Sequence, residues 1–279
     1  MLTVLNVLSA ASILFLVALG LEVILGIMGV INMAHPGLMA VGAYASLEAS
    51  RRGAGTVMAM LLGALAVAVA GALLEPLLRR LYSRPLDTIL ATWGLSLVIT
   101  QLIILAFGQA PVPFDGPGDG LTTIAGTGFS SYRLTLIGVA VVLGLALQAL
   151  VRFTRAGLLA RAVMADEDLS RGVGVNTSRV RTTTFALGAG LAGLSGALIA
   201  PLAPLEPYLG VNYLIPAFLV VLLAGRSLGG LAVAVVVLST TQTLVALHTS
   251  SIVAGIVLVV VAMLLLRLRP QGLLRGAAA

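Results

Sequence analysis

The sequence predicts an all-α, polytopic transmembrane helical bundle of eight or nine membrane elements, one of them short or re-entrant. Hydrophobic residues make up 59% of the 279 residues and charged residues only 9%, whereas a soluble domain carries about a quarter charged residues. The mean hydropathy is +1.14. The apolar residues gather in runs of the length that crosses a bilayer, about 20 residues. Lipid must therefore cover much of the apolar surface.

Eight apolar runs are expected to form membrane helices. They cover residues 4–31, 56–78, 87–107, 134–151, 182–203, 211–224, 231–247 and 252–266. A ninth stretch, residues 38–47, is too short to span comfortably, so we expect either a re-entrant half-helix or a short helix crossing at a thinned point. Residues 1–279 are expected to form a single transmembrane domain, with the segment 155–181 as a cytoplasmic part of it.

Arginine placement predicts the orientation in the membrane. Arginines cluster in the segment 152–181, in the loop 79–84 and in the C-terminal tail, and positive charge marks cytoplasmic loops. The C-terminus is therefore expected to be cytoplasmic and the arginine-free loop 108–132 external. Arg51 and Arg52 would then lie outside, where Glu48 is spaced to pair with Arg52. The side of the N-terminus depends on whether residues 38–47 cross.

Motifs for covalent chemistry and for metal binding are scarce. The chain has no cysteine, and His35 and His248 lack the spacing of zinc ligands. It contains neither a Gly-x-Ser-x-Gly elbow nor a Walker-type phosphate loop. We therefore expect no enzyme activity, no metal and no cofactor in this chain; if ATP is consumed, a partner subunit binds it. The net charge of +6 does not indicate nucleic acid, because the arginines flank apolar runs.

The first candidate for a transport pathway is the break between Asn32 and Gly37. Pro36 cannot donate a backbone hydrogen bond, and a broken helix frees backbone groups that can face a cavity. Asn32 and His35 are three residues apart and would share a face of a helix. The alternative is an ordinary turn between two helices. Residues 26–42 and 210–230 both combine Gly, Asn and Pro with an apolar run, a weak hint of the inverted repeats found in transporters.

Polar residues inside two apolar runs add further pathway candidates. A carboxyl at Glu22 must pair, protonate or face water; it either faces the pathway or holds two helices together. Thr92 and Ser96 lie on one helical stripe that either lines a polar path or hydrogen-bonds between helices. Trp93 either faces the path or belongs to an interfacial belt. A second stripe, of small residues between 188 and 197, is assigned to close helix packing.

The segment 155–181 is a candidate docking element for a soluble partner. It carries Asp166, Glu167 and Asp168 among its arginines, and residues 158–169 have helical spacing. Orientation in the membrane requires arginine but no interspersed acidic cluster, so the charge pattern favours docking over a solvated loop.

Two segments resemble a known family. Residues 26–46, reading GIMGVINMAHPGLMAVGAYAS, and residues 157–198 resemble the branched-chain amino-acid and urea permeases of bacterial ABC importers; the C-terminal RPQGL is similar too. The resemblance implies two related permease subunits, two cytoplasmic ATP-binding subunits and an external solute-binding protein. By position, the resemblance implies that residues of the second segment couple the permease to the ATP-binding subunits and that residues of the first segment belong to the family signature. These are Arg161, Ala162, Gly174, Asn176 and Arg179 on the second, and Asn32, Ala34 and His35 on the first.

The resulting hypothesis is a permease subunit of an ATP-driven importer in the bacterial inner membrane. Its substrate would be a branched-chain amino acid, urea or a short amide, because residues 90–97, reading LATWGLSL, look closer to the urea branch. One rival is a secondary transporter driven by protons, with Glu22 and His35 as the relay. Another rival is a passive channel.

Overall fold

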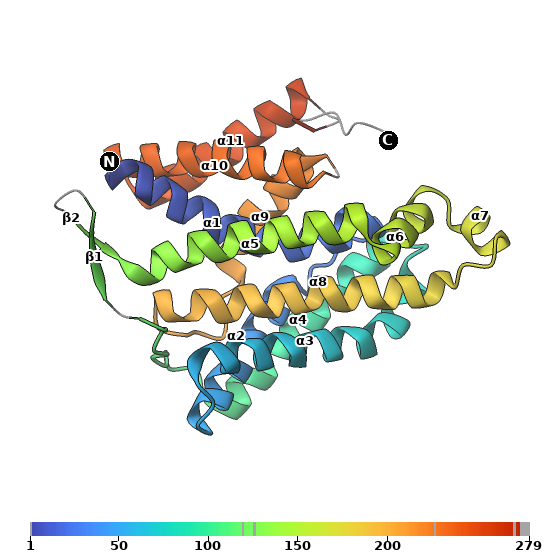
Figure 1. Ribbon diagram of the computed structural model, residues 1–279, viewed down its shortest axis with the longest axis horizontal. Helices are drawn as coiled ribbons and strands as arrows, with labels where there is room; N and C mark the ends of the chain where they lie inside the picture. The colour runs from blue at the N-terminus through green and yellow to red at the C-terminus, as the bar shows by residue number, and fades with distance from the viewer. Residues whose placement is uncertain (1, 119, 125–126, 226, 270–271, 274–279) are drawn as a thin grey trace.

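The computed structural model describes residues 2–118, 120–124, 127–225, 227–269 and 272–273, and most of them are helical (Figure 1). The first half contains α1 (Leu2–Glu22), η1 (Val23–Ile27), α2 (His35–Arg51), α3 (Thr56–Leu78), η2 (Arg79–Leu81), α4 (Pro85–Phe107), β1 (Leu121–Ile124) and β2 (Thr127–Ser130). The second half contains α5 (Ser131–Phe153), α6 (Arg155–Ala165), α7 (Glu167–Gly172), α8 (Thr177–Ile199), η3 (Ala200–Leu202), α9 (Val211–Ala224), α10 (Leu228–His248) and α11 (Ser251–Leu268).

The helix content confirms the all-α membrane bundle. Among the described residues, seven helices are long and apolar enough to cross a bilayer. The helices α2 and α9 are shorter, with 17 and 14 residues. Together with the seven long helices they agree with the expected eight or nine membrane elements. Large apolar side chains such as Leu97 and Leu105 are exposed on the outer faces, where lipid removes them from water. The chain is a multi-pass membrane protein.

The first helix ends earlier than its apolar run. The run 4–31 predicted one helix with a break at Asn32–Gly37, and this expectation was wrong in detail. The α-helix stops at Glu22, a π-helical turn follows, and Gly29 has a φ of +67°, a conformation that glycine adopts without a steric penalty. Pro36 does not break a helix; it lies in the first turn of α2, where its missing N–H would have no helical partner.

The two ends of the bundle are distinct. Figure 1 shows α6 and α7 at one end, here called the α6–α7 end, and the N-terminus with the β1–β2 hairpin at the opposite end, here called the hairpin end. The hairpin is antiparallel, with Leu121 opposite Ser130, and it lies in the arginine-free loop 108–132. Glu48 and Arg52 form the expected ion pair, with 2.8 Å between Oε1 and Nε. The part of the C-terminal tail beyond Leu273 lies outside the described residues.

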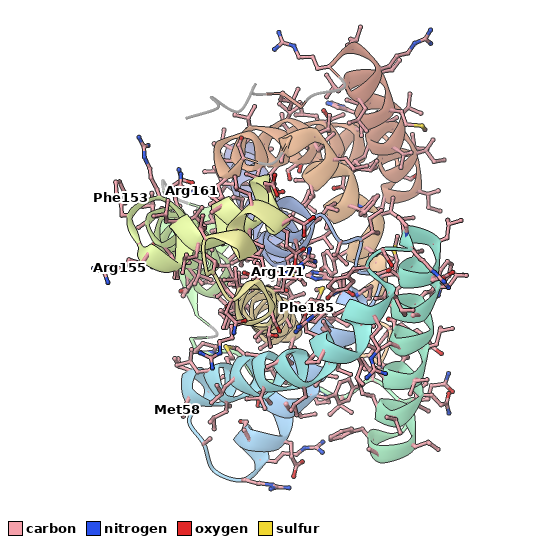
Figure 2. The ribbon with its side chains drawn as sticks, turned by 90° about the vertical axis from the view of Figure 1, so that its right-hand side faces the viewer. Met58, Phe153, Arg155, Arg161, Arg171 and Phe185 are labelled. Atoms are coloured by element: carbon pink, nitrogen blue, oxygen red, sulfur yellow. The ribbon has the colours of Figure 1, made fainter. Side chains whose placement is uncertain are left out.

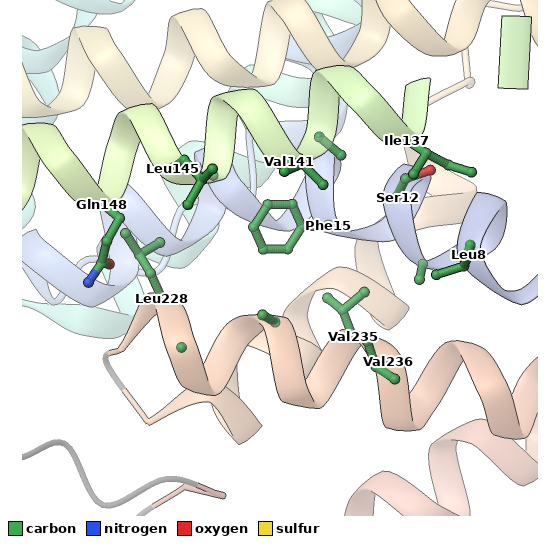
Figure 3. A pocket seen from close by; sticks show the side chains of 15 residues that line it. Leu8, Ser12, Phe15, Ile137, Val141, Leu145, Gln148, Leu228, Val235 and Val236 are labelled. Carbon is green, nitrogen blue, oxygen red and sulfur yellow. The ribbon is translucent and has the colours of Figure 1, made fainter. Parts of the chain in front are cut away.

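An apolar groove of about 380 Å³ lies between α5 and α10, with α1 beneath it (Figure 3). The residues that line this groove show in which direction α9 and α10 run. Phe15 of α1 lies in its floor, and Leu228 lies near Gln148. Because Gln148 precedes the turn into α6, the start of α10 lies towards the α6–α7 end. The preceding helix, α9, therefore runs towards the α6–α7 end as well.

The two short helices begin in the interior and run to opposite ends. His35, the first residue of α2, contacts the carbonyl of Val17, well inside α1. Gly210, just before α9, packs so closely on Pro36 that a Cβ there would lie 2.5 Å from Pro36 Cα. From this shared point α2 runs towards the hairpin end and α9 towards the α6–α7 end. The two helices belong to residues 26–42 and 210–230, the segments whose similar composition suggested a weak inverted repeat.

The helix α8 lies at the centre of the packing because small residues let three helices approach its backbone. A Cβ on Gly196 would lie 2.0 Å from the carbonyl oxygen of Met39 in α2, and a Cβ on Gly193 would lie 2.7 Å from Val67 in α3. A Cβ on Gly20 of α1 would lie 2.7 Å from the carbonyl oxygen of Gly188. The expected packing role of the small-residue stripe is confirmed.

Candidate functional site

The interior break runs along the polar stripe of α4. The backbone N–H of Met33 donates to Thr92 Oγ1 over 3.1 Å, and one turn further on Ser96 Oγ would lie 3.1 Å from a Cβ placed on Gly37. Thr92 and Ser96 are both buried, as helical spacing predicted, while Trp93 is 57% exposed on the outward face. The structure thus brings two of the three predicted α4 residues to the break and leaves Trp93 facing away from it.

Asn32 and His35 are buried at the start of α2, with exposed fractions of 1% and 0%. Asn32 lies outside the helix, so the expected shared helical face was wrong; its Oδ1 accepts a hydrogen bond from the N–H of Ala34 over 3.0 Å. His35 Nε2 is 3.1 Å from the carbonyl oxygen of Val17. A carbonyl oxygen only accepts, so Nε2 carries a proton.

Two polar atoms at this point lack a protein partner. Within the described part of the chain, neither Asn32 Nδ2 nor His35 Nδ1 has a hydrogen-bond partner. A buried polar group without a partner costs about 1–3 kcal/mol. Asn32 therefore offers an unused donor and His35 an unused ring nitrogen in the interior of the bundle.

The starts of α2 and α9 add an electrostatic component to this site, called here the helix junction. Pro36 and Gly210 are in van der Waals contact, so the two helix N-termini lie together. Each N-terminus carries the positive end of a helix dipole, and broken helices in transporters use such ends to bind anionic groups of substrates. The two dipoles therefore add positive potential at the helix junction.

Glu22 lies at the end of α1 and is buried. Gly26, one turn on, leaves room for the carboxyl, because a Cβ at that position would lie 2.8 Å from Glu22 Oε1. The carboxyl therefore lies along its own helix at the start of the π-helical turn. This places Glu22 next to the interior break in the chain.

The predicted coupling segment forms two helices instead of one. The helical spacing of residues 158–169 predicted a continuous helix, but Asp166 is extended and caps α7 by accepting a hydrogen bond from Leu169 N over 2.9 Å. Figure 2 views the end of the molecule where Arg161 and Arg171 lie. Most of the predicted coupling residues are exposed there: Ala162, Asp166, Asp168, Gly174, Asn176 and Arg179. Arg161 and Glu167 are half-buried.

Glu167 connects the coupling segment to α8. Its Oε1 lies 3.1 Å from Arg171 Nη2, its Oε2 accepts a hydrogen bond from Arg181, and Thr177 adds a further hydrogen bond. Burial alone would raise the pKa of Glu167, but the hydrogen bond and charge of Arg181 outweigh burial, and the pKa is lowered from 4.5. The carboxylate is therefore charged at neutral pH, and the bridge between α7 and α8 is intact there.

A second buried cluster, which the sequence analysis missed, connects α3 to α8. Glu75 is 0% exposed; its carboxylate accepts hydrogen bonds from Arg79 Nε over 3.0 Å and from Thr182 Oγ1 over 2.7 Å. Arg79 also donates to Ser178. The signal was present in the sequence, since Glu75 is a carboxyl in an apolar run with an arginine four residues on.

Short helices that meet inside a multi-pass bundle, together with a charged helical segment at one end, are typical of membrane transporters. The chain belongs to the family described as the permease component of branched-chain amino acid transport systems, whose sequence profile matches residues 3–263. It is thus a permease of the ABC-importer type.

The chain is similar to curated proteins over most of its length. It is 27% identical over 277 residues to the high-affinity branched-chain amino acid transport system permease protein LivH of Escherichia coli (strain K12), and to LivH of Salmonella typhimurium; each alignment covers 93% of this chain and 90% of the relative. It is 25% identical to BraD of Pseudomonas aeruginosa, a permease protein described in the same words, with 82% of each chain covered. No solved structure matches.

Proposed function

We propose that this chain is the translocating subunit of an ATP-driven importer for branched-chain amino acids. The observation that carries the proposal is the position of residues 26–46, the segment that resembles the family signature. This segment forms the interior break and places Asn32 and His35 at the helix junction. The names of the relatives support the branched-chain substrate.

The helix junction offers complementary groups to a zwitterion. The N-termini of α2 and α9 and the Nδ2 of Asn32 suit a carboxylate, and the unpaired Nδ1 of His35 suits an ammonium group. Urea is neutral and would use neither the paired dipoles nor a separate ammonium acceptor, so the junction favours an amino acid over the urea alternative. Thr92 anchors the break at Met33, and Ser96 lies at the next turn. Glu22 completes the set of proposed pathway residues, whereas Trp93 is left out because it faces away from the break.

Energy would come from cytoplasmic ATP-binding subunits that dock on the coupling segment, residues 155–181, which is also called the docking segment below. The segment carries acidic and basic side chains together, and Leu169 and Val173 beside them are 67% and 74% exposed. Movement of α7 would reach α8 through Glu167 and Arg181, and α3 through Glu75 and Arg79. ATP would stay on the partner, and this chain would hold no cofactor and perform no covalent chemistry.

The remaining assignments complete the proposed assembly. A second related permease subunit would share the pathway, and an extracytoplasmic solute-binding protein would deliver the substrate to the hairpin end. The α6–α7 end, which holds the arginine-rich segments 79–84 and 152–181, would face the cytoplasm of a bacterium, with the C-terminus on the same side. The N-terminus, at the hairpin end, would then be external.

Charge reversal on the docking segment is expected to weaken association with the ATPase. The triple variant D166R/E167R/D168R places three positive charges among arginines, so co-purification of the ATP-binding subunit should fall at least tenfold, as like-charge juxtaposition costs several kcal/mol. The control is E48R, because Glu48 lies at the opposite end. Unchanged co-purification of the triple variant would contradict the docking assignment.

Reconstitution tests the source of energy. In liposomes, the purified chain alone should not concentrate leucine, whereas the assembly with ATP-binding subunits, second permease and binding protein should do so when ATP is enclosed. Concentrative uptake by the chain alone under a pH gradient would establish the proton-coupled rival with Glu22 and His35. Downhill flux through the chain alone would favour the channel. Uptake of urea but not leucine by the assembly would overturn the substrate assignment.

A further inference from the structure

A polar cavity of about 270 Å³ lies between the coupling segment and the break in the first membrane helix. Its walls come from Met28 and Gly29, which follow η1, and from α6, α7 and α8. The volume lies just below the range of pockets that hold small molecules. The residues that decide its chemistry are Met28, Val163, Met164, Val180, Glu167 and Arg181.

The cavity combines both charges with an apolar surface. Met28, Val163 and Val180 supply aliphatic wall, and the two ionic side chains, Glu167 and Arg181, face each other across α7 and α8. A ligand that matches this lining carries one negative group, one positive group and a short aliphatic chain. That description fits a free amino acid with an apolar side chain.

Both ionic groups retain hydrogen-bonding capacity. A guanidinium offers five N–H donors; Arg181 donates to Glu167 through Nη2, while its Nε is buried without a partner among the described residues. A carboxylate offers about four lone-pair sites, and Glu167 uses three of them for Arg171, Arg181 and Thr177. Donors on the Arg181 guanidinium and one acceptor site on Glu167 therefore remain for a carboxylate and an ammonium group.

We propose that this cavity binds one zwitterionic, apolar amino acid from the α6–α7 side, and that bound ligand regulates the transporter by its product. The proposal rests on the proposed function for the ligand class and for the cytoplasmic orientation. The ligand carboxylate accepts from the N–H groups of the Arg181 guanidinium that Glu167 leaves unused, and its ammonium donates to Glu167. Its side chain lies against Met28, Val163 and Val180.

The position of the cavity explains why occupancy would regulate transport. One wall belongs to the break at Met28 and Gly29, and the opposite walls belong to the helices of the docking segment. A ligand that bridges Glu167 and Arg181 holds α7 against α8. Product that accumulates in the cytoplasm therefore resists the movement of the docking segment and slows import.

Ligand analogues test the charge match without changing the protein. Binding of radiolabelled leucine to the purified chain in nanodiscs is competed with isocaproate, which lacks the ammonium group, and with isoamylamine, which lacks the carboxylate. We expect leucine to compete at least tenfold better than either analogue, because isocaproate has no ammonium group to donate to Glu167 and isoamylamine has no carboxylate to accept from Arg181. Equal competition by all three would show a hydrated cavity without a zwitterion site and would overturn the proposal.

A cavity-filling variant separates this cavity from the helix junction. Ala160 lines the cavity and is buried, whereas Ala165 lies on the same helix and is exposed. A160L should lower leucine affinity at least tenfold, while A165L and the junction variant H35Q should retain binding at the cavity. If A160L binds leucine like the wild type, or if the wild type binds none, the proposal is wrong even when the assembled importer takes up leucine. Failure of leucine uptake by the assembly, in contrast, refutes the transport substrate.

Discussion

The variant G196A is expected to lose at least about 3 kcal/mol of stability, the upper end of the cost of overpacking a core. The added Cβ would lie 2.0 Å from the carbonyl oxygen of Met39 and 2.6 Å from its carbonyl carbon. Both atoms belong to the backbone of α2, so no side-chain rotation relieves the clash, and α2 must move away from α8. Because the helix junction is at the start of α2, leucine uptake should fall as well. Thermal unfolding in detergent and uptake by the assembled importer measure the two effects.

The matched control is G94A. Gly94 also lies inside a membrane helix, but a Cβ there would meet no atom within 4 Å. The substitution should leave stability unchanged or raise it by up to about 1 kcal/mol, since alanine favours helix more than glycine does. If G196A and G94A unfold at the same temperature, the close contact between α2 and α8 does not exist in the protein.

The variant E75Q is expected to cost roughly 3 kcal/mol, the lower end of the range for breaking a buried ion pair. The carboxylate of Glu75 is fully buried, while its partner Arg79 has a side chain that is 30% exposed, so part of the stranded positive charge reaches water. Glutamine keeps one acceptor oxygen but replaces the other by an NH₂ donor, so Arg79 and Thr182 lose one of the two oxygens that they share, and the contact between α3 and α8 weakens at the α6–α7 end. Unfolding in detergent should detect the loss of stability, and ATP-driven uptake should detect the loss of coupling.

The control for this variant is E48Q. Glu48 and Arg52 form an ion pair with the same i,i+4 spacing, but their side chains are 38% and 78% exposed. An exposed pair of this kind contributes about 0–1 kcal/mol. A loss of stability in E75Q no greater than in E48Q would count against a structural role for the buried cluster of Glu75.

Local patterns predicted several parts of the candidate site correctly. The four-residue spacing of Thr92 and Ser96 predicted one polar stripe, and both are buried. The small-residue stripe predicted close packing of α8, and the spacing of Glu48 and Arg52 predicted their ion pair. Each of these depends on residues within one helix, where spacing alone fixes which side chains share a face.

Long-range contacts could not be predicted in the same way. Asn32 was expected to share a helical face with His35, but the chain leaves the helix at Gly29 and re-enters it only at His35. The structural role of Glu75 was missed because it depends on a hydrogen bond from Thr182, which is 107 residues away in the sequence. The meeting of Pro36 with Gly210 likewise joins segments that share no local pattern.

The sequence by itself determined that this protein is a multi-pass helical membrane protein, because apolar runs of bilayer length and clustered arginines respond to the solvent and need no tertiary contacts. The permease class came from the resemblance of residues 26–46 and 157–198 to a known family. The sequence also showed which polar residues, such as Glu22, Thr92 and Ser96, lie inside apolar runs, where polar side chains are rare. Only the tertiary structure decided that α2 and α9 begin at one interior point and that Glu167 and Glu75 connect the docking segment to the bundle. These contacts join residues far apart in the chain, and only packing in three dimensions brings them together.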